Sequence, residues 1–250
     1  MKKILVTGAC EPGIGEAITR SLLSAGYAVI GTHEPATPIP TFNEQERANL
    51  TLVPLEHSSR ASVENFCGTI KDGPLHGFIN SQMYFHVEDL DPFDIDLWEK
   101  SISVNLTMPT IIFRTLVNSL ISGSSVVLIS STEGFMGSFG ASAYAASKAA
   151  IHNLVKTWAN LSGEQNVRVN AIAAGWIGGV MDTDDVFNLS REITPLGRLG
   201  HAAEIANVVH FLIEERSSFV NGSVVTVDGG YSGVDRIAKF EFERSSEPAA

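Results

Sequence analysis

Short apolar runs alternate along the chain with longer segments in which apolar residues recur at helical spacing. Seven short runs predict β-strands, at residues 3–7, 28–32, 50–55, 77–80, 125–129, 168–172 and 224–227. Five longer segments predict helices, at residues 13–25, 62–70, 97–120, 144–161 and 202–212. Strands that alternate with helices indicate βαβ units, so we predict an α/β fold with a doubly wound parallel sheet of seven strands in a single domain.

Two segments depart from this alternation. Three prolines prevent residues 34–49 from forming one long helix, so that at most residues 42–48 form a short one. The tail beyond Gly230 becomes charged and then rich in Ser, Pro and Ala. We expect its end, within residues 236–250, to be disordered unless a neighbouring subunit holds it.

The composition of the 250 residues, 44% hydrophobic and 18% charged, suits one folded core. The formal net charge of −11 repels nucleic acid and anionic membrane surfaces, so we expect neither as a partner. The apolar run after the N-terminus is too short for a signal peptide, and no run reaches the about 18 residues of a membrane-spanning helix. We therefore expect a cytoplasmic protein. Its two cysteines lack paired spacing, so we expect no disulfide or metal site.

A glycine-rich turn follows the first predicted strand, with Gly8, Gly13 and Gly15 and with Ile14 between the last two. Glycines let the backbone turn tightly and approach a pyrophosphate, while the start of the next helix offers unpaired N–H groups and a positive dipole end. This placement predicts a dinucleotide-binding turn. An ordinary strand-to-helix turn is the alternative.

Glu34 follows the second predicted strand, where dinucleotide-binding folds commonly carry a carboxylate that accepts hydrogen bonds from the adenosine ribose. Such a carboxylate repels a 2′-phosphate, and no Arg or Lys occurs in the glycine turn or just after this strand to neutralise one. Glu34 therefore favours NAD(H), with NADP(H) possible. A solvated loop carboxylate is the structural alternative.

Tyr144 and Lys148 lie four residues apart at the start of a predicted helix, so both project from one helical face. A tyrosine hydroxyl titrates at about pH 10, and a nearby ammonium lowers that pKa. The pair predicts an acid/base tyrosine, although an exposed Tyr and Lys also reach this spacing by chance.

Two further polar residues are candidates for the same site. Ser131 follows a predicted strand at its carboxyl end, where open α/β sheets bind ligands, and its hydroxyl could polarise a substrate oxygen. Asn105 interrupts an apolar helical stretch, and a buried amide there needs a specific partner or an ordered water. Its role is either catalytic or structural.

The order of these residues resembles the short-chain dehydrogenase/reductase family over nearly the whole chain. The matching positions are Thr7 and Gly8, Gly13 to Gly15, Asn80, Asn105, Ser131, the pair Tyr144 and Lys148, and residues 168–172, 195–198 and 227–230. The resemblance implies a Rossmann-type fold. Its cofactor half would cover about residues 1–120, its catalytic and substrate half about residues 121–235, and its tail residues 236–250.

The resemblance also implies a role for each catalytic residue. Tyr144 is then the general acid/base, and Lys148 lowers its pKa and binds the nicotinamide ribose. Ser131 orients the carbonyl oxygen, and Asn105 holds a water that links Lys148 to solvent. The implied activity is an NAD(P)(H)-dependent interconversion of a carbonyl and a secondary alcohol on a small molecule by hydride transfer.

For the cofactor, the resemblance implies that Glu56 and His57 flank the adenine, that Asn80 lies beside the adenosine ribose and that the backbone of Ile177 meets the nicotinamide carboxamide. The sequence departs from the family pattern here. The glycine turn is one residue longer, His57 replaces a usually apolar side chain, and residues 80–83 lack the usual Ala-Gly. These changes motivate an alternative, a catalytically weak cofactor-sensing or scaffold protein. A lyase or dehalogenase that uses no nicotinamide is a further alternative, against which the retained lysine speaks.

Substrate choice is expected to lie with residues 84–87, 133–142 and 176–193, which follow strand ends around the catalytic groups. The predicted helices 97–120 and 144–161 resemble the pair through which family members form dimers of dimers. We therefore expect a homotetramer, with a homodimer also compatible with the sequence.

Overall fold

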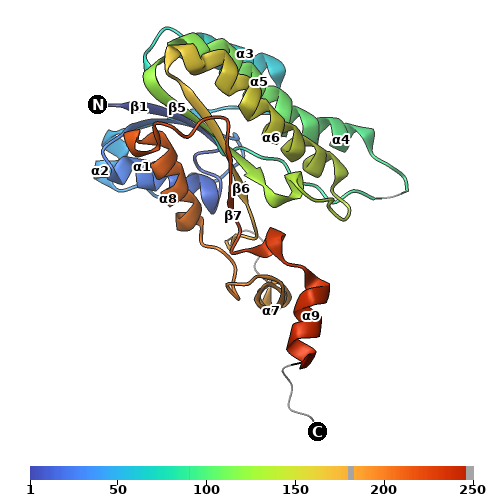
Figure 1. Cartoon of the computed structure of the whole chain (residues 1–250). Helices are drawn as coiled ribbons and strands as arrows, with labels where there is room; N and C mark the ends of the chain where they lie inside the picture. Colours follow the sequence, from blue (N-terminus) through green and yellow to red (C-terminus); the bar gives the residue numbers. More distant parts are fainter. Residues whose placement is uncertain (90, 180–182, 246–250) are drawn as a thin grey trace.

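The computed structural model describes residues 1–89, 91–179 and 183–245. Seven parallel strands form one sheet in the order β3-β2-β1-β4-β5-β6-β7 (Figure 1). Their bounds are β1 Lys3–Thr7, β2 Ala28–His33, β3 Leu50–Pro54, β4 Leu75–Asn80, β5 Leu120–Ser131, β6 Arg168–Ala174 and β7 Val224–Val227. The chain winds outward from β1 to β3 and then returns to β4, so the winding reverses between β1 and β4. Open α/β sheets bind ligands at the carboxyl edge beside such a reversal.

Helices cover both faces of this sheet (Figure 1). On one face α1 (Ile14–Ser24) packs against α8 (Ala202–Ile213); the other face carries α3 (Arg60–Ile70), α4 (Ile95–Ile102), α5 (Met108–Leu116) and α6 (Ser142–Ser162). Alternate residues of β1 face the two layers, because Ile4 and Val6 belong to the core under α1 and α8 while Leu5 belongs to the core under α3, α5 and α6. A strand buried on both faces is apolar at successive positions, which is why the strands appear as continuous runs.

The predicted fold class is confirmed, and β1 and β7 have the predicted bounds. The helix predicted over residues 97–120 is present but irregular: α4 continues through a π-helical turn at Ser103–Thr107 into α5, and β5 already begins at Leu120. Pro109 explains the irregularity, because it has no N–H to donate to the carbonyl of Asn105 four residues earlier. The wider turn accommodates the lost helical hydrogen bond.

The remaining helices differ from the sequence prediction. Helix α2 (Glu44–Ala48) begins later than predicted because Asn43 and Glu46 form a capping box. Helices α7 (Asp184–Ile193) and α9 (Arg236–Ser245) were not predicted. The disorder expected for the end of the tail is not tested by α9. Residues 246–250 lie outside the described residues. Short 3-10 turns occur at Val117–Ser119, Thr132–Gly134, Gly163–Gln165, Glu215–Ser217 and Tyr231–Gly233.

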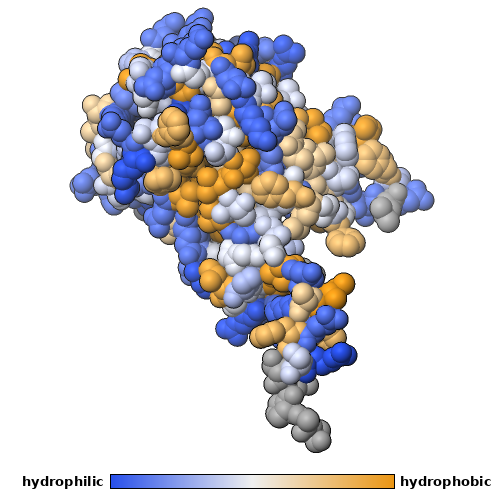
Figure 2. Space-filling view, viewed as in Figure 1, coloured by the Kyte–Doolittle hydropathy of each residue, from blue (hydrophilic) through white to orange (hydrophobic). Residues whose placement is uncertain are grey.

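Helices α7 and α9 project together beyond the ends of β6 and β7 (Figure 1). Apolar and polar side chains mix on the surface of this projection (Figure 2), and Ile237 and Phe240 are among its exposed apolar residues. None of the described helices combines the length and the hydrophobicity needed to cross a membrane.

Candidate active site

The carboxyl edge of the sheet collects residues from distant parts of the chain. Strands β1 and β4 end with Thr7 and Asn80 in register, and β5 and β6 end with Ser131 and Ala174 in register. Helix α6 packs against the turn that follows β5, which places the first turn of α6 at the same edge. The fold thereby brings the predicted cofactor and catalytic residues to one side of the sheet.

The glycine turn between β1 and α1 has a backbone geometry that favours glycine. Gly8 and Gly13 have φ angles of 69° and 83°, and a Cβ on Gly15 would lie 2.0 Å from the carbonyl oxygen of Gly8. Helix α1 begins at Ile14 without a side-chain cap, so its first N–H groups can bind an anion. The longer turn is closed by its own backbone, because Glu11 N–H donates to the Gly8 carbonyl at 3.1 Å. These features fit a bound pyrophosphate.

Glu34 is held by His57, which the sequence did not suggest. Its Oε1 accepts hydrogen bonds from the backbone N–H of His57 at 2.9 Å and from His57 Nδ1 at 3.0 Å. The other ring nitrogen of His57 lies 2.9 Å from Thr32 Oγ1, and the imidazole is buried. Burial alone would raise the pKa of Glu34, but the two hydrogen bonds from His57 outweigh it and the pKa is lowered. The carboxylate is therefore ionised and fixed in place, whereas the neighbouring Glu56 is exposed.

Asn80 and Gln82 lie next to the glycine turn. Asn80 Oδ1 accepts a hydrogen bond from Thr7 Oγ1 at 2.8 Å and so joins the ends of β1 and β4. A Cβ on Gly8 would lie 2.8 Å from the backbone nitrogen of Gln82 and 3.1 Å from its Oε1. This Oε1 is buried and lacks a hydrogen-bond partner among the described residues. An unpaired acceptor at the foot of an anion-binding turn fits a dinucleotide, whose ribose hydroxyls are donors.

Tyr144, Lys148 and Ser131 come together above β5. Tyr144 and Lys148 lie one turn apart on α6, and Lys148 Nζ is 5.3 Å from the centroid of the Tyr144 ring. The Ser131 hydroxyl forms a hydrogen bond with the Tyr144 side chain. Glu88 fixes the start of α6 by accepting a hydrogen bond from the Ala143 N–H at 2.8 Å. The three predicted catalytic side chains are thus neighbours.

Burial moves the pKa values of the pair in opposite directions. It raises the pKa of the Tyr144 hydroxyl to about 12, with a further increase from the charge of Glu133 and a decrease from the Ser131 hydrogen bond. It lowers the pKa of Lys148 to about 8, because this residue is only 1% exposed and its ammonium is desolvated. The ammonium donates a hydrogen bond to the Ile129 carbonyl at 3.0 Å. The sequence predicts a lowered pKa for Tyr144, and the structure instead gives a raised one. The spacing of the two residues could not reveal that both are desolvated.

Asn105 positions a backbone segment rather than facing an open space. Its Oδ1 accepts from the Tyr84 N–H at 2.8 Å, and its Nδ2 donates to the Tyr84 carbonyl at 2.8 Å and to Ser101 Oγ at 3.2 Å. The side chain is fully buried. The side-chain amide of Asn105 is occupied by protein partners. A water held at this residue would therefore have to bind its backbone carbonyl, which lacks the usual helical donor because residue 109 is a proline.

Asn105→Ala is expected to lower the free energy of unfolding by about 2 to 3 kcal/mol, because it leaves the backbone N–H and carbonyl of Tyr84 without their hydrogen-bond partners in a partly buried segment. Urea denaturation followed by circular dichroism measures the change. Asn207→Ala, which removes an exposed amide from α8, is the matched control and should change stability little. Equal stability of the Asn105 and Asn207 variants would contradict the positioning role.

Three further side chains lie near Tyr144; Phe85 and Glu133 belong to the segments 84–87 and 133–142 that were expected to determine substrate choice, whereas Met83 precedes them. Met83 Sδ lies 3.9 Å from the Tyr144 hydroxyl, and Phe85 packs edge-on against the Tyr144 ring at 5.2 Å between centroids. Glu133 follows Ser131 in the next turn and accepts no bond from Tyr144, yet its charge acts on that phenol. Their positions just after β4 and β5 were the available signal, because residues that follow strand ends at this edge face the ligand.

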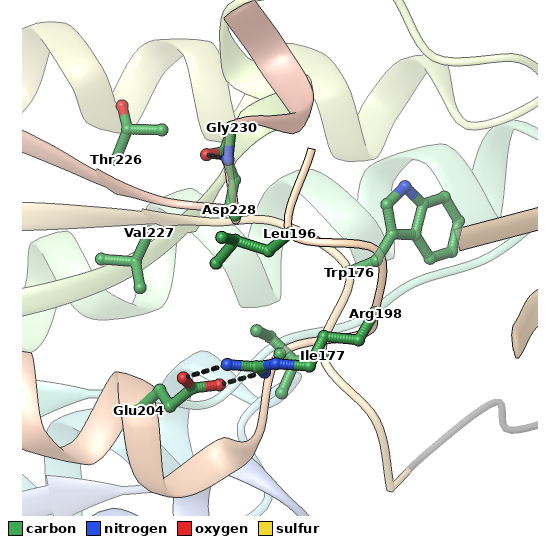
Figure 3. A pocket seen from close by; sticks show the side chains of 11 residues that line it. Trp176, Ile177, Leu196, Arg198, Glu204, Thr226, Val227, Asp228 and Gly230 are labelled. Atoms are coloured by element: carbon green, nitrogen blue, oxygen red, sulfur yellow. Dashed lines mark hydrogen bonds and ion pairs between the residues drawn. The ribbon is translucent and has the colours of Figure 1, made fainter. Parts of the chain in front are cut away.

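A cavity of about 470 Å³ lies between the loop after β6 and the end of β7 (Figure 3). Ile177 lines it and pairs with Gly200, while Arg198 and Glu204 close one side with two hydrogen bonds of 2.8 Å. The same loop approaches the glycine turn, because a Cβ on Gly179 would lie 3.8 Å from the turn. Ile177 is therefore carried by a segment that borders both the cavity and the predicted pyrophosphate site. Residues 180–182 of the expected lid lie outside the described part of the chain.

Comparison with known proteins yields matches over nearly the whole chain. The model of a protein family described as enoyl-(acyl carrier protein) reductase matches residues 8–232. The 3-oxoacyl-(acyl-carrier-protein) reductase of Aquifex aeolicus is 32% identical, over 92% of this chain and 96% of that protein. The acetoacetyl-CoA reductase of an Acinetobacter strain is 29% identical, over 92% of this chain and 97% of that protein.

Solved structures give the same picture. A short chain dehydrogenase family protein from Francisella tularensis superposes with a TM-score of 0.85 at 24% identity, over 94% of this chain and all of that chain. A 4-hydroxyisoleucine dehydrogenase complexed with NADH superposes with a TM-score of 0.81 at 26% identity and equal coverage. The similarity to the Francisella tularensis protein supports the fold. The 4-hydroxyisoleucine dehydrogenase is a similar protein whose structure contains NADH.

Proposed function

The chain belongs to the short-chain dehydrogenase/reductase family, whose members described above are reductases and dehydrogenases, and is an NAD(P)-dependent oxidoreductase that interconverts a carbonyl and an alcohol. From this premise, we propose that Tyr144 is its acid/base group. The observation that carries the proposal is the meeting of Tyr144 with Ser131 and Lys148 at the carboxyl edge. Asn105 supports the site from behind by fixing the segment after β4.

Each side chain has a definite task in this reaction. When bound, the nicotinamide of NAD(P)(H) supplies or accepts the hydride. Ser131 shares a hydrogen bond with Tyr144 and orients the substrate oxygen beside it. Tyr144 donates its proton to that oxygen during reduction and takes it back during oxidation. The ammonium of Lys148, one helical turn away, stabilises the phenolate that forms.

The raised pKa of Tyr144 belongs to the cofactor-free protein. A phenol with a pKa of about 12 keeps its proton at neutral pH, as an ordinary tyrosine does, and is the form that donates a proton during reduction. Oxidation needs the phenolate, which the charge of Lys148 stabilises. Both directions therefore use the same pair of residues.

We propose that Gly8, Gly13, Ile14 and Gly15 bind the pyrophosphate and that Glu34 binds the adenosine ribose and selects NAD(H). The support for NAD(H) is the ionised Glu34 carboxylate, which is fixed in place at the end of β2. The roles of Glu56 and His57 at the adenine, Asn80 at the ribose and Ile177 at the carboxamide stay proposals of the same kind.

Glu34→Ser is expected to raise kcat/KM with NADPH relative to NADH by roughly tenfold, because it removes the carboxylate that repels a 2′-phosphate. Initial rates with both cofactors and one ketone measure the ratio. Glu44→Ser removes an exposed carboxylate from α2 and should leave the ratio unchanged. Preference of the wild-type protein for NADPH would overturn the assignment of Glu34.

We propose a cytoplasmic homotetramer as the working form. An open groove along α5 and α6, whose lining includes Leu106, Ile111 and Leu154 beside Thr107, Thr110 and Asn153, supports pairing of these helices between subunits. Light scattering distinguishes a tetramer from the dimer that is also compatible with this surface.

A further inference from the structure

Glu133 adjoins the serine that is proposed to orient the substrate oxygen. It sits in the 3-10 turn Thr132–Gly134, two residues after Ser131. Its backbone N–H donates to Ser131 Oγ at 3.2 Å, so the turn is tied to that hydroxyl. Its negative charge contributes to the raised pKa of Tyr144, which is consistent with a carboxylate on the same side of the sheet.

One oxygen of this carboxyl group has no partner. Oε2 of Glu133 is buried and accepts no hydrogen bond from the described residues, whereas the Ser138 side chain bonds to the same carboxyl group. Burial raises the pKa of Glu133. A buried carboxylate oxygen without a donor is costly, so a donor from outside the polypeptide is expected to complete it.

Apolar side chains are frequent in the segments that adjoin Tyr144 and Glu133. Met83 and Phe85 contact Tyr144 from the side of β4, and Phe135 and Phe139 are exposed in the segment that follows Glu133. Among these segments Glu133 contributes a carboxyl group next to Ser131. In ligand pockets of this composition, a few polar groups set the orientation and the choice of ligand.

We propose that Glu133 is a specificity residue that accepts a hydrogen bond from a hydroxyl or ammonium group carried by the substrate close to its reacting carbonyl. Because Glu133 adjoins Ser131, a donor on the neighbouring carbon would reach Oε2 while the carbonyl oxygen stays at Ser131 and Tyr144. An ammonium would also offset the negative charge that raises the pKa of Tyr144. This inference rests on the proposed function and adds the substrate class to it.

The test compares three ketones of similar size with NADH: methyl isopropyl ketone, which carries no donor; acetoin, which carries a hydroxyl; and the dimethylamino analogue of acetoin, assayed where it is protonated. For the wild-type protein, kcat/KM is expected to be roughly tenfold or more higher for one or both donor ketones than for methyl isopropyl ketone. Glu133→Leu should abolish this preference. Glu133→Gln keeps an acceptor but no charge, so it should preserve a preference for acetoin and lose one for the ammonium.

Glu64→Gln is the matched control, because it removes the charge of an exposed carboxylate on α3 and should preserve the preference. Thermal unfolding and NADH fluorescence show whether each variant is folded and binds cofactor. Equal kcat/KM of the wild-type protein for all three ketones, or an unchanged preference in a folded Glu133→Leu, would overturn the role of Glu133 and leave the proposed function intact. Failure of the wild-type protein to reduce any ketone would refute the proposed function, and with it this inference.

Discussion

Tyr144→Phe is expected to lower kcat for carbonyl reduction by about 10³-fold, the middle of the range for loss of a positioned acid/base group. Phenylalanine keeps the ring that packs against Phe85 but removes the hydroxyl that bonds to Ser131. Without it, the substrate oxygen loses the proton donor that we propose for reduction. The absorbance of NADH during steady-state turnover measures kcat and KM.

NADH binding separates catalysis from folding in this experiment. Tyr144→Phe should bind NADH with nearly the wild-type dissociation constant and unfold within about 1 kcal/mol of the wild-type protein, because one hydrogen bond is lost. Tyr27→Phe is the control: Tyr27 also has a raised pKa through burial but packs against His210, away from the carboxyl edge. Turnover by Tyr144→Phe equal to that of Tyr27→Phe would remove Tyr144 from the mechanism.

Most of the sheet could be predicted because its strands are buried on both faces. The run 3–7 is apolar at successive positions since Leu5 faces one helix layer and Ile4 and Val6 the other. Helices were harder to predict where features other than apolar spacing, such as N-terminal caps, stabilise them. Helix α7 is strongly polar along most of its length and begins at a Thr183 cap, and the pattern of apolar spacing does not report caps.

The π-helical turn around Asn105 shows a second limit of periodicity. The apolar spacing of residues 97–120 continues across the π-helical turn, so the pattern predicts one helix. Pro109 was the available signal, because a proline inside a helical pattern removes the hydrogen bond to the residue four positions earlier. That residue is Asn105, whose side chain then fixes the Tyr84 backbone.

Candidate site residues could be predicted where their chemistry is local. Tyr144 and Lys148 share a helix and Ser131 ends a strand, so spacing and order were sufficient to suggest them. The contact of Glu34 with His57 was not visible, because it joins residues 23 apart through the pairing of β2 with β3. The shifted pKa values of Tyr144 and Lys148 could not be predicted from the sequence either, because desolvation depends on how the residues at the carboxyl edge of the sheet pack together.

Lys148→Met is expected to cut kcat by about 10²-fold to 10³-fold while making the cofactor-free protein more stable. The wild-type ammonium is buried, forms no salt bridge within the described residues and has a pKa lowered from 10.5 to about 8. That difference corresponds to about 3 kcal/mol against folding at neutral pH. Loss of the hydrogen bond to the Ile129 carbonyl destabilises the variant by about 1 kcal/mol. The free energy of unfolding is therefore expected to increase by about 2 kcal/mol.

The pH dependence of this gain distinguishes a buried charge from simple repacking. Between a folded pKa of about 8 and the unfolded value of 10.5, the unfolded wild-type chain binds more protons than the folded one, so wild-type stability rises with pH across that window. The advantage of Lys148→Met is therefore largest below pH 8 and disappears toward pH 10.5, as urea denaturation at both ends would show. Lys156→Met, an exposed position on α6, should show no such dependence. A pH-independent advantage for Lys148→Met would mean that better packing, and not the removal of an ammonium kept for catalysis, sets its stability.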